Sequence, residues 1–156
     1  MVEEDIRNIF LEHPEIIYGF TDIAYSPYAD TYKSALVFGP FSFKYAAVNA
    51  GLGWIGKNDV VITKQYGPRV RLSVILINEP FTYGPKVLYS NCPENCRKCV
   101  DACPHEALHN VQWNRNSFRK DIIDYRLCNE KRSLYLKTHG RKNACGLCMV
   151  ACPFGI

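Results

Sequence analysis

Two cysteine-rich segments determine how this chain of 156 residues can fold: Cys92-Pro-Glu-Asn-Cys96-Arg-Lys-Cys99-Val-Asp-Ala-Cys103-Pro104 and Cys145-Gly-Leu-Cys148-Met-Val-Ala-Cys152-Pro153. Both segments end in the pattern Cys-x2-Cys-x3-Cys-Pro. Together with Cys128 they hold all eight cysteines of the chain, and the first 91 residues hold none. A disulfide scaffold would distribute its bridges over the whole fold, so this concentration of cysteine indicates metal ligation.

Each segment resembles the cysteine run of bacterial ferredoxins. In that run a Cys-x2-Cys turn aims two thiolates at one four-iron cube, and the cysteine before proline ligates the other cube. Two cubes need four thiolates each, so they use all the cysteines without remainder, and Cys128 is assigned as the last ligand by elimination. The predicted ligands are Cys92, Cys96, Cys99 and Cys152 for cluster I, and Cys103, Cys128, Cys145 and Cys148 for cluster II. Cys92 and Cys96 are separated by three residues instead of the usual two, and Pro93 is expected to absorb the extra one.

Other uses of the cysteines remain open at this point. Four disulfides would be unusual in a chain without an export signal. Structural zinc also takes paired Cys-x2-Cys motifs, but the repeated Cys-x3-Cys-Pro adds a ligand that zinc ribbons do not require. Scattered buried thiols would not keep such regular spacing. Two [4Fe-4S] clusters are therefore the favoured interpretation.

Composition and charge agree with a soluble iron–sulfur protein. Hydrophobic residues make up 47% and charged residues 22% of the chain, as in globular proteins. No apolar run is long enough to span a membrane, and the acidic N-terminus does not resemble a secretory signal, so a cytoplasmic location is expected.

The charge is unevenly divided along the chain. Residues 1–90 contain 8 Lys+Arg and 9 Asp+Glu, and residues 91–156 contain 11 and 6, which gives −1 and +5. Two oxidised four-iron clusters with thiolate ligands, at about −2 each, would compensate most of this positive charge. An RNA-binding surface is the second explanation. Its candidate residues are Arg97, Lys98, Arg115, Arg119, Lys120 and Lys142.

The pattern of apolar and turn residues predicts an α+β fold with a boundary near residue 88. Residues 1–88 would form a small N-terminal α/β scaffold with a short sheet, and residues 89–156 a ferredoxin-like α domain that holds both clusters. Helices are expected at residues 2–12, 41–50 and 117–137, and strands at 16–24, 35–38, 60–63 and 70–77, the last two joined as a hairpin.

The glycine-rich stretch Gly51-Leu-Gly-Trp-Ile-Gly-Lys-Asn58 fits the pattern G-x-G-x-x-G. Nucleotide-binding loops of this kind follow a strand and open a helix, whereas here a predicted helix precedes the loop and a strand follows it. We therefore expect Gly51 to end the helix and a tight turn to bury Trp54. The alternative is that the backbone approaches a bulky cofactor. Its contacts would then come from Gly51, Gly53, Trp54, Gly56, Lys57 and Asn58.

Residues 46–58, residues 66–76 (Tyr-Gly-Pro-Arg-Val-Arg-Leu-Ser-Val-Ile-Leu) and the two cysteine segments together resemble the epoxyqueuosine reductase family, and more closely its shorter double-cluster relatives. The resemblance covers roughly residues 44–156. It implies two four-iron clusters that deliver electrons to a cobalamin in an N-terminal α/β domain, where reduced cobalt removes the epoxide oxygen from a modified tRNA base. It also implies a ligand role for Cys128, because the family has a lone cysteine in its linking helix.

The N-terminal half departs from that family. It is much shorter than the family's cobalamin domain, and residues 31–50 contain no Asp or Glu, although the family has an acidic proton donor shortly before the glycine loop. We therefore predict an electron-transfer iron–sulfur protein that serves a redox partner protein or a small-molecule acceptor. The alternatives are a reductase that binds cobalamin or another cofactor near residues 51–58, and an RNA-binding module that contacts tRNA.

Overall fold

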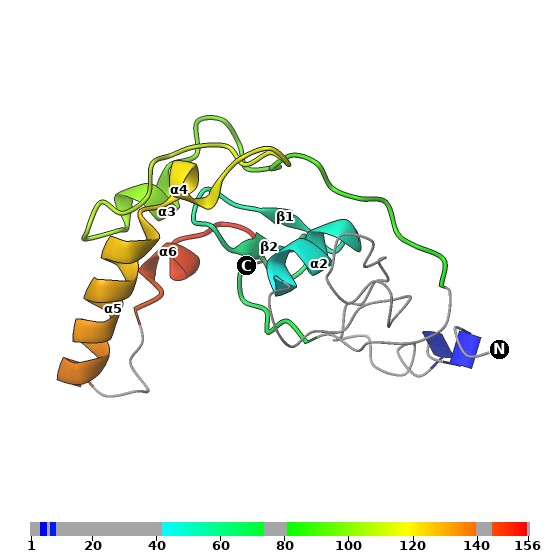
Figure 1. Ribbon diagram of the computed structural model, residues 1–156, viewed down its shortest axis with the longest axis horizontal. Helices are drawn as coiled ribbons and strands as arrows, with labels where there is room; N and C mark the ends of the chain where they lie inside the picture. The colour runs from blue at the N-terminus through cyan, green and yellow to red at the C-terminus, as the bar shows by residue number, and fades with distance from the viewer. Residues whose placement is uncertain (1–3, 6, 9–41, 74–80, 140–144, 156) are drawn as a thin grey trace. The chain divides into compact units, whose positions relative to one another are not determined.

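The computed structural model describes residues 4–5, 7–8, 42–73, 81–139 and 145–155 (Figure 1). Within these residues short helices accompany one two-stranded antiparallel sheet, which confirms the α+β class. Residues 4–5 and 7–8 are helical, in agreement with the helix expected near the N-terminus. The strands predicted at 16–24 and 35–38 lie outside the described residues. No helix in the described ranges is long and apolar enough to cross a membrane.

Helix α2 (Phe43–Asn49) confirms the helix predicted before the glycine-rich stretch. Ala46, Ala47 and Val48 form its buried face. The helix ends at Asn49, and Gly51, two residues later, has a left-handed φ of +76° and an N–H that donates to the Val48 carbonyl at 3.1 Å. A Cβ at Gly51 would lie 2.7 Å from the Pro85 carbonyl oxygen, so glycine is required here by conformation and by space.

Strands β1 (Trp54–Ile55) and β2 (Val61–Ile62) pair in antiparallel register, with Trp54 opposite Ile62 and Ile55 opposite Val61. All four side chains are buried. The predicted hairpin between residues 60–63 and 70–77 is not found among the described residues, where β2 pairs with β1, and residues 74–77 lie outside them. Residues 70–73 are irregular and exposed or half-buried.

Helices α3 (Lys98–Asp101) and α6 (Leu147–Val150) occupy equivalent places in the two cysteine segments and pack against each other. Each is a single turn that begins after the first cysteine of a Cys-x2-Cys pair and contains the second. Each ends two residues before the cysteine that precedes proline. The repeated spacing therefore gives a repeated turn–helix–turn, seen as the green α3 and red α6 of Figure 1.

The single helix predicted for residues 117–137 is wrong, because the structure has two helices there: α4 (Arg119–Ile122) and α5 (Tyr125–His139). Ile123 between them is extended and forms an antiparallel bridge with Leu108. The carboxylate of Asp124 then accepts hydrogen bonds from the N–H groups of Arg126 and Leu127 at 3.1 and 2.9 Å, which caps the new helix. Ile123 and Leu108 enter a small core with Cys99 and Ala107.

The chain forms two compact units, and each is made of two separate stretches of sequence. One unit contains residues 1–53 and 71–87, and the other contains residues 54–70 and 88–156. The predicted domains 1–88 and 89–156 stay a prediction. In terms of backbone contacts, however, the β1–β2 hairpin and the residues up to Val70 group with the cysteine-rich segments.

Candidate metal centre

All eight cysteines are free thiols. Cys99 and Cys152 are buried, and the other six are half-buried. The four-disulfide interpretation is therefore wrong. The cysteines are also not scattered, because each of them lies near three others, as the cavity and the electrostatic interactions below describe.

The first group of four cysteines lines one cavity in the unit formed by residues 54–70 and 88–156. Cys92, Cys96 and Cys99 reach it from the first segment, and Cys152 reaches it from the second. These are the four ligands predicted for cluster I. The remaining lining residues are Lys57, Asn58, Ile62, Pro153 and Phe154.

Electrostatic interactions among the thiols identify the same group. Burial raises the pKa of the Cys99 thiol to about 11, and repulsion by the other three cysteines of the group adds to the increase. Burial also raises the pKa of Cys152, although a hydrogen bond from the Phe154 backbone and the charge of Arg69 favour its thiolate. Four thiolates at this site would repel one another. A cluster of positive irons would remove this penalty, since metal ligation requires the deprotonated form.

The second group contains the four cysteines predicted for cluster II. Burial raises the pKa of Cys148 to about 11, with further repulsion from Cys145, Cys128, Cys99 and Cys103, in decreasing order. Burial also raises the pKa of Cys128, together with repulsion from Cys103 and Cys145, while Arg132 and Arg119 oppose the increase. Cys128 lies on α5, so this helix brings the isolated cysteine to the second segment.

The donor set fits four-iron clusters. Four thiols that border a cavity can surround a multi-atom group, and thiolates are the usual ligands of such clusters. Among the described residues, no three Cys, His, Asp or Glu side chains are close enough together to hold a single metal ion.

The extra residue between Cys92 and Cys96 is accommodated by a turn. The N–H of Cys96 donates to the Pro93 carbonyl at 3.0 Å, which closes the loop that three intervening residues create. Gln112 fixes the other end of this loop, because its side-chain amide donates to the Cys92 carbonyl at 2.7 Å. These two hydrogen bonds explain how the segment accommodates the extra residue, as expected from the sequence.

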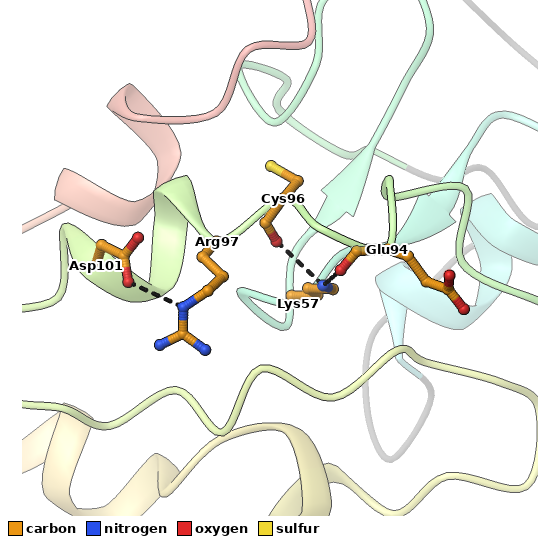
Figure 2. A network of polar contacts seen from close by, with 5 residues as sticks. All are labelled: Lys57, Glu94, Cys96, Arg97 and Asp101. Carbon is orange, nitrogen blue, oxygen red and sulfur yellow. Dashed lines mark hydrogen bonds and ion pairs between the residues drawn. The ribbon is translucent and has the colours of Figure 1, made fainter.

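Lys57 lies beside this first group. Its side chain is only 2% exposed. Its ammonium donates to the carbonyl oxygens of Glu94 at 2.8 Å and Cys96 at 3.0 Å, and Figure 2 shows the nitrogen pointing at both. From the sequence, Lys57 was one of the residues of the glycine-rich stretch that would contact a cofactor. The structure places it against the backbone that carries two of the cluster I cysteines.

Two further side chains from residues 54–70 hold the second cysteine segment. The amide of Asn58 donates to the Cys148 carbonyl at 3.2 Å. The guanidinium of Arg69 donates to the carbonyls of Val150, Cys152 and Phe154 at 3.1, 3.3 and 2.9 Å. Sequence reasoning missed the role of Arg69. The sequence gives little indication of this role, because an arginine after Gly-Pro is typical of an ordinary turn.

Three other candidates in the glycine-rich stretch, Gly51, Trp54 and Gly56, contribute to the packing of the fold. Trp54 is buried and meets the ring of Phe154 edge-on at 5.0 Å, which confirms the expected buried turn. A Cβ at Gly56 would overlap the side chain of Ile62. Gly51 and Gly53 belong to the other unit, where Gly51 follows α2.

The basic residues proposed for RNA binding are partly engaged with acidic or aromatic neighbours. Arg97 pairs with Asp101 at 3.3 Å, as Figure 2 shows. Arg119 pairs with the buried Asp59 at 2.8 Å, and Lys120 lies over the ring of Phe118. Lys142 lies outside the described residues.

Comparison with known proteins agrees with this geometry. Residues 91–155 match the family model of the 4Fe-4S double cluster binding domain. The epoxyqueuosine reductase of Listeria monocytogenes is 33% identical over 129 residues, which are 78% of this chain and 32% of that protein. The Bacillus subtilis enzyme is 34% identical over 125 residues, which are 78% of this chain and 31% of that protein. The chain spans about a third of the length of these curated relatives.

Solved structures give the same result. A crystal structure of epoxyqueuosine reductase with a tRNA-Tyr epoxyqueuosine-modified tRNA stem loop superimposes with a TM-score of 0.55 and 26% identity, over 79% of this chain and 32% of that one. A selenomethionine-labelled epoxyqueuosine reductase superimposes with a TM-score of 0.56 and 25% identity, over 97% and 38%. These matches confirm the resemblance to epoxyqueuosine reductases and the presence of two [4Fe-4S] clusters, and they remove the zinc interpretation.

Proposed function

We propose that this iron–sulfur protein, which carries two [4Fe-4S] clusters and resembles epoxyqueuosine reductases, transfers single electrons between its clusters and a redox partner protein or a small-molecule acceptor. The observation that supports this function is the gathering of eight free cysteines into two neighbouring groups of four. A bound four-iron cluster supplies one-electron chemistry, at a potential set by nearby charge, hydrogen bonds and solvent exposure.

We assign Cys92, Cys96, Cys99 and Cys152 to cluster I and Cys103, Cys128, Cys145 and Cys148 to cluster II. In this assignment each segment gives its proline-adjacent cysteine to the other cluster, which is the ferredoxin-like arrangement. Packing of α3 against α6 supports the exchange, because it sets the two segments side by side. The groups are also close, since Cys103, Cys128 and Cys148 of the second pack against the small core that contains Cys99 of the first. An electron would therefore have a short path between the clusters.

The proposal predicts the metal content of the protein. Protein purified without oxygen should be brown and contain about eight iron and about eight acid-labile sulfide per chain. Reduction with dithionite should produce electron paramagnetic resonance signals from two interacting clusters. Colourless protein, or protein with about four iron and no second signal after reconstitution, would contradict the two-cluster assignment.

A second candidate function is a cobalamin-dependent reductase that acts on a tRNA base. It is favoured by the identity to epoxyqueuosine reductases, which extends over three quarters of this chain, and by the solved relative bound to a tRNA stem loop. Gly51, Gly53, Trp54, Gly56, Lys57 and Asn58 are the residues that would contact the cofactor. Within that group, Lys57 and Asn58 already donate to the backbone of the cysteine segments, which favours the electron-carrier function.

The two functions predict different results when the holoprotein is mixed with cob(II)alamin. As an electron carrier, it should leave the cobalamin absorption spectrum unchanged and bind a tRNA stem loop no more tightly than an unrelated stem loop. A reductase should shift the spectrum at stoichiometric concentration. Its tRNA affinity should also fall steeply with salt, by roughly one power of the salt concentration for each phosphate contact.

A further inference from the structure

Lys57 is a buried cation whose ordinary counter-ion is missing from the described part of the chain. Its side chain is 2% exposed, and it lines the cavity of the first cysteine group. The ion pairs found among the described residues do not include it. Its hydrogen bonds to Glu94 and Cys96 reach neutral carbonyl oxygens. A buried ammonium in such surroundings is costly unless a negative charge lies close by.

A cluster bound at this cavity would supply that negative charge. A four-iron cluster with four thiolate ligands carries about −2 when oxidised and about −3 when reduced. Because the ammonium lies beside the same cavity, the cluster and Lys57 would compensate each other in a water-poor environment. The attraction would be stronger for the reduced cluster, since that form carries one more negative charge.

Among the described residues, the cations near the second cysteine group are Arg119 and Arg132, and they are placed differently; Arg141 and Lys142, which precede Cys145 in the sequence, lie outside the described residues. Arg119 is exposed and is paired with the carboxylate of Asp59 at 2.8 Å, which offsets part of its charge. Arg132 is exposed, and its charge is screened by water and salt. The hairpin reaches the second group through Asn58, a neutral amide that donates to the Cys148 carbonyl. Arg69, which acts on Cys152 of the first group, is exposed as well.

We propose that Lys57 is the built-in counter-charge of cluster I, which raises the reduction potential of cluster I above that of cluster II. The inference rests on the proposed ligand sets. It gives electron transfer a direction, because an electron entering at cluster II would move to cluster I. Lys57 acts as a positioning residue too, since its two hydrogen bonds fix the backbone between Cys92 and Cys96.

The test separates charge from hydrogen bonding in the full-length holoprotein. Lys57→Gln removes the charge but keeps N–H donors, Lys57→Met removes both, and Lys57→Arg keeps the charge. Lys64→Gln is the matched control, because Lys64 is an exposed lysine that follows the same hairpin. Each protein is analysed for iron and titrated potentiometrically under electron paramagnetic resonance. The Cys152→Ser variant, which should keep only cluster II, identifies which potential belongs to which cluster.

We expect Lys57→Gln to retain about eight iron and to lower the potential of cluster I alone. A tenfold fall in the reduction equilibrium constant corresponds to about 59 mV for a one-electron couple. Lys64→Gln should change neither potential, and Lys57→Met should lose cluster I iron most readily. If Lys57→Gln loses the iron of cluster I as well, the proposal requires that Lys57→Arg retains this iron, because the positive charge would then be essential for binding the cluster.

Unchanged potentials in an iron-replete Lys57→Gln variant would overturn the inference and leave the proposed function intact. Iron loss in both Lys57→Gln and Lys57→Arg would overturn it too, since neither charge nor donors would then explain the role of Lys57. A wild-type protein without two clusters would instead refute the proposed function itself.

Discussion

Serine in place of Cys152 is expected to lower the iron content from about eight to about four per chain. Cys152 is buried and shares a cavity with Cys92, Cys96 and Cys99. A serine hydroxyl is a poorer iron ligand than a thiolate, so the first cluster should be lost while the second remains. Iron and sulfide analysis of anaerobically purified protein measures the effect directly, and an iron-replete variant would contradict the assignment of Cys152.

Double variants decide whether the two segments exchange ligands. If Cys96 and Cys152 hold the same cluster, Cys96→Ser with Cys152→Ser should also leave about four iron. Cys148→Ser with Cys152→Ser should remove both clusters, because these residues would hold different ones. If each segment instead ligated its own cluster, the two results would be reversed. The comparison needs only an iron assay and does not depend on assigning a spectrum to either cluster.

The Cys-x2-Cys turn and short helix of each segment could be predicted from the sequence because their geometry is local, whereas the exchange of Cys103 and Cys152 between the segments was predicted from the resemblance to bacterial ferredoxins. A Cys-x2-Cys turn followed by one helical turn places its thiols within about ten residues of chain, and the same spacing occurs twice. The helix end before Gly51 was predictable for the same reason, since a left-handed residue after a helix favours glycine. In each case the interactions that determine the structure join residues that are near in sequence.

The errors arose where distant residues decide the structure. Apolar spacing favoured one helix across Ile123, but pairing of Ile123 with Leu108 interrupts it, and Asp124 then caps α5. The capping residue Asp124 can be recognised in the sequence, whereas the bridge between Ile123 and Leu108 cannot. The hydrogen bonds of Lys57 cross 37 and 39 residues. The glycine pattern identified Lys57 as a candidate residue, but it could not identify the carbonyl groups to which the ammonium donates.

Alanine substitutions at the backbone contact between residues 66–67 and 154–155 are also expected to have a large effect, in this case on how firmly the first cluster is held. A Cβ on Gly67 would overlap the Phe154 carbonyl, and a Cβ on Gly155 would overlap the Tyr66 backbone. Both glycines also have left-handed φ angles, +56° and +72°. Alanine at either position should cost about 1–2 kcal/mol in conformation and about 1–3 kcal/mol in overlap. The strained contact would lie directly after Cys152, in the segment where Arg69 donates to three backbone carbonyls.

We therefore expect Gly67→Ala to release iron from the first cluster several-fold faster than the wild-type protein does. The measurement is the rate of absorbance loss on warming with an iron chelator, because iron–sulfur proteins unfold irreversibly and a rate is then the proper quantity. Lys64→Ala is the matched control, since Lys64 lies in the same turn as Gly67 and its side chain is exposed. Equal rates for the two variants would show that backbone packing against residues 154–155 does not hold Cys152 in place.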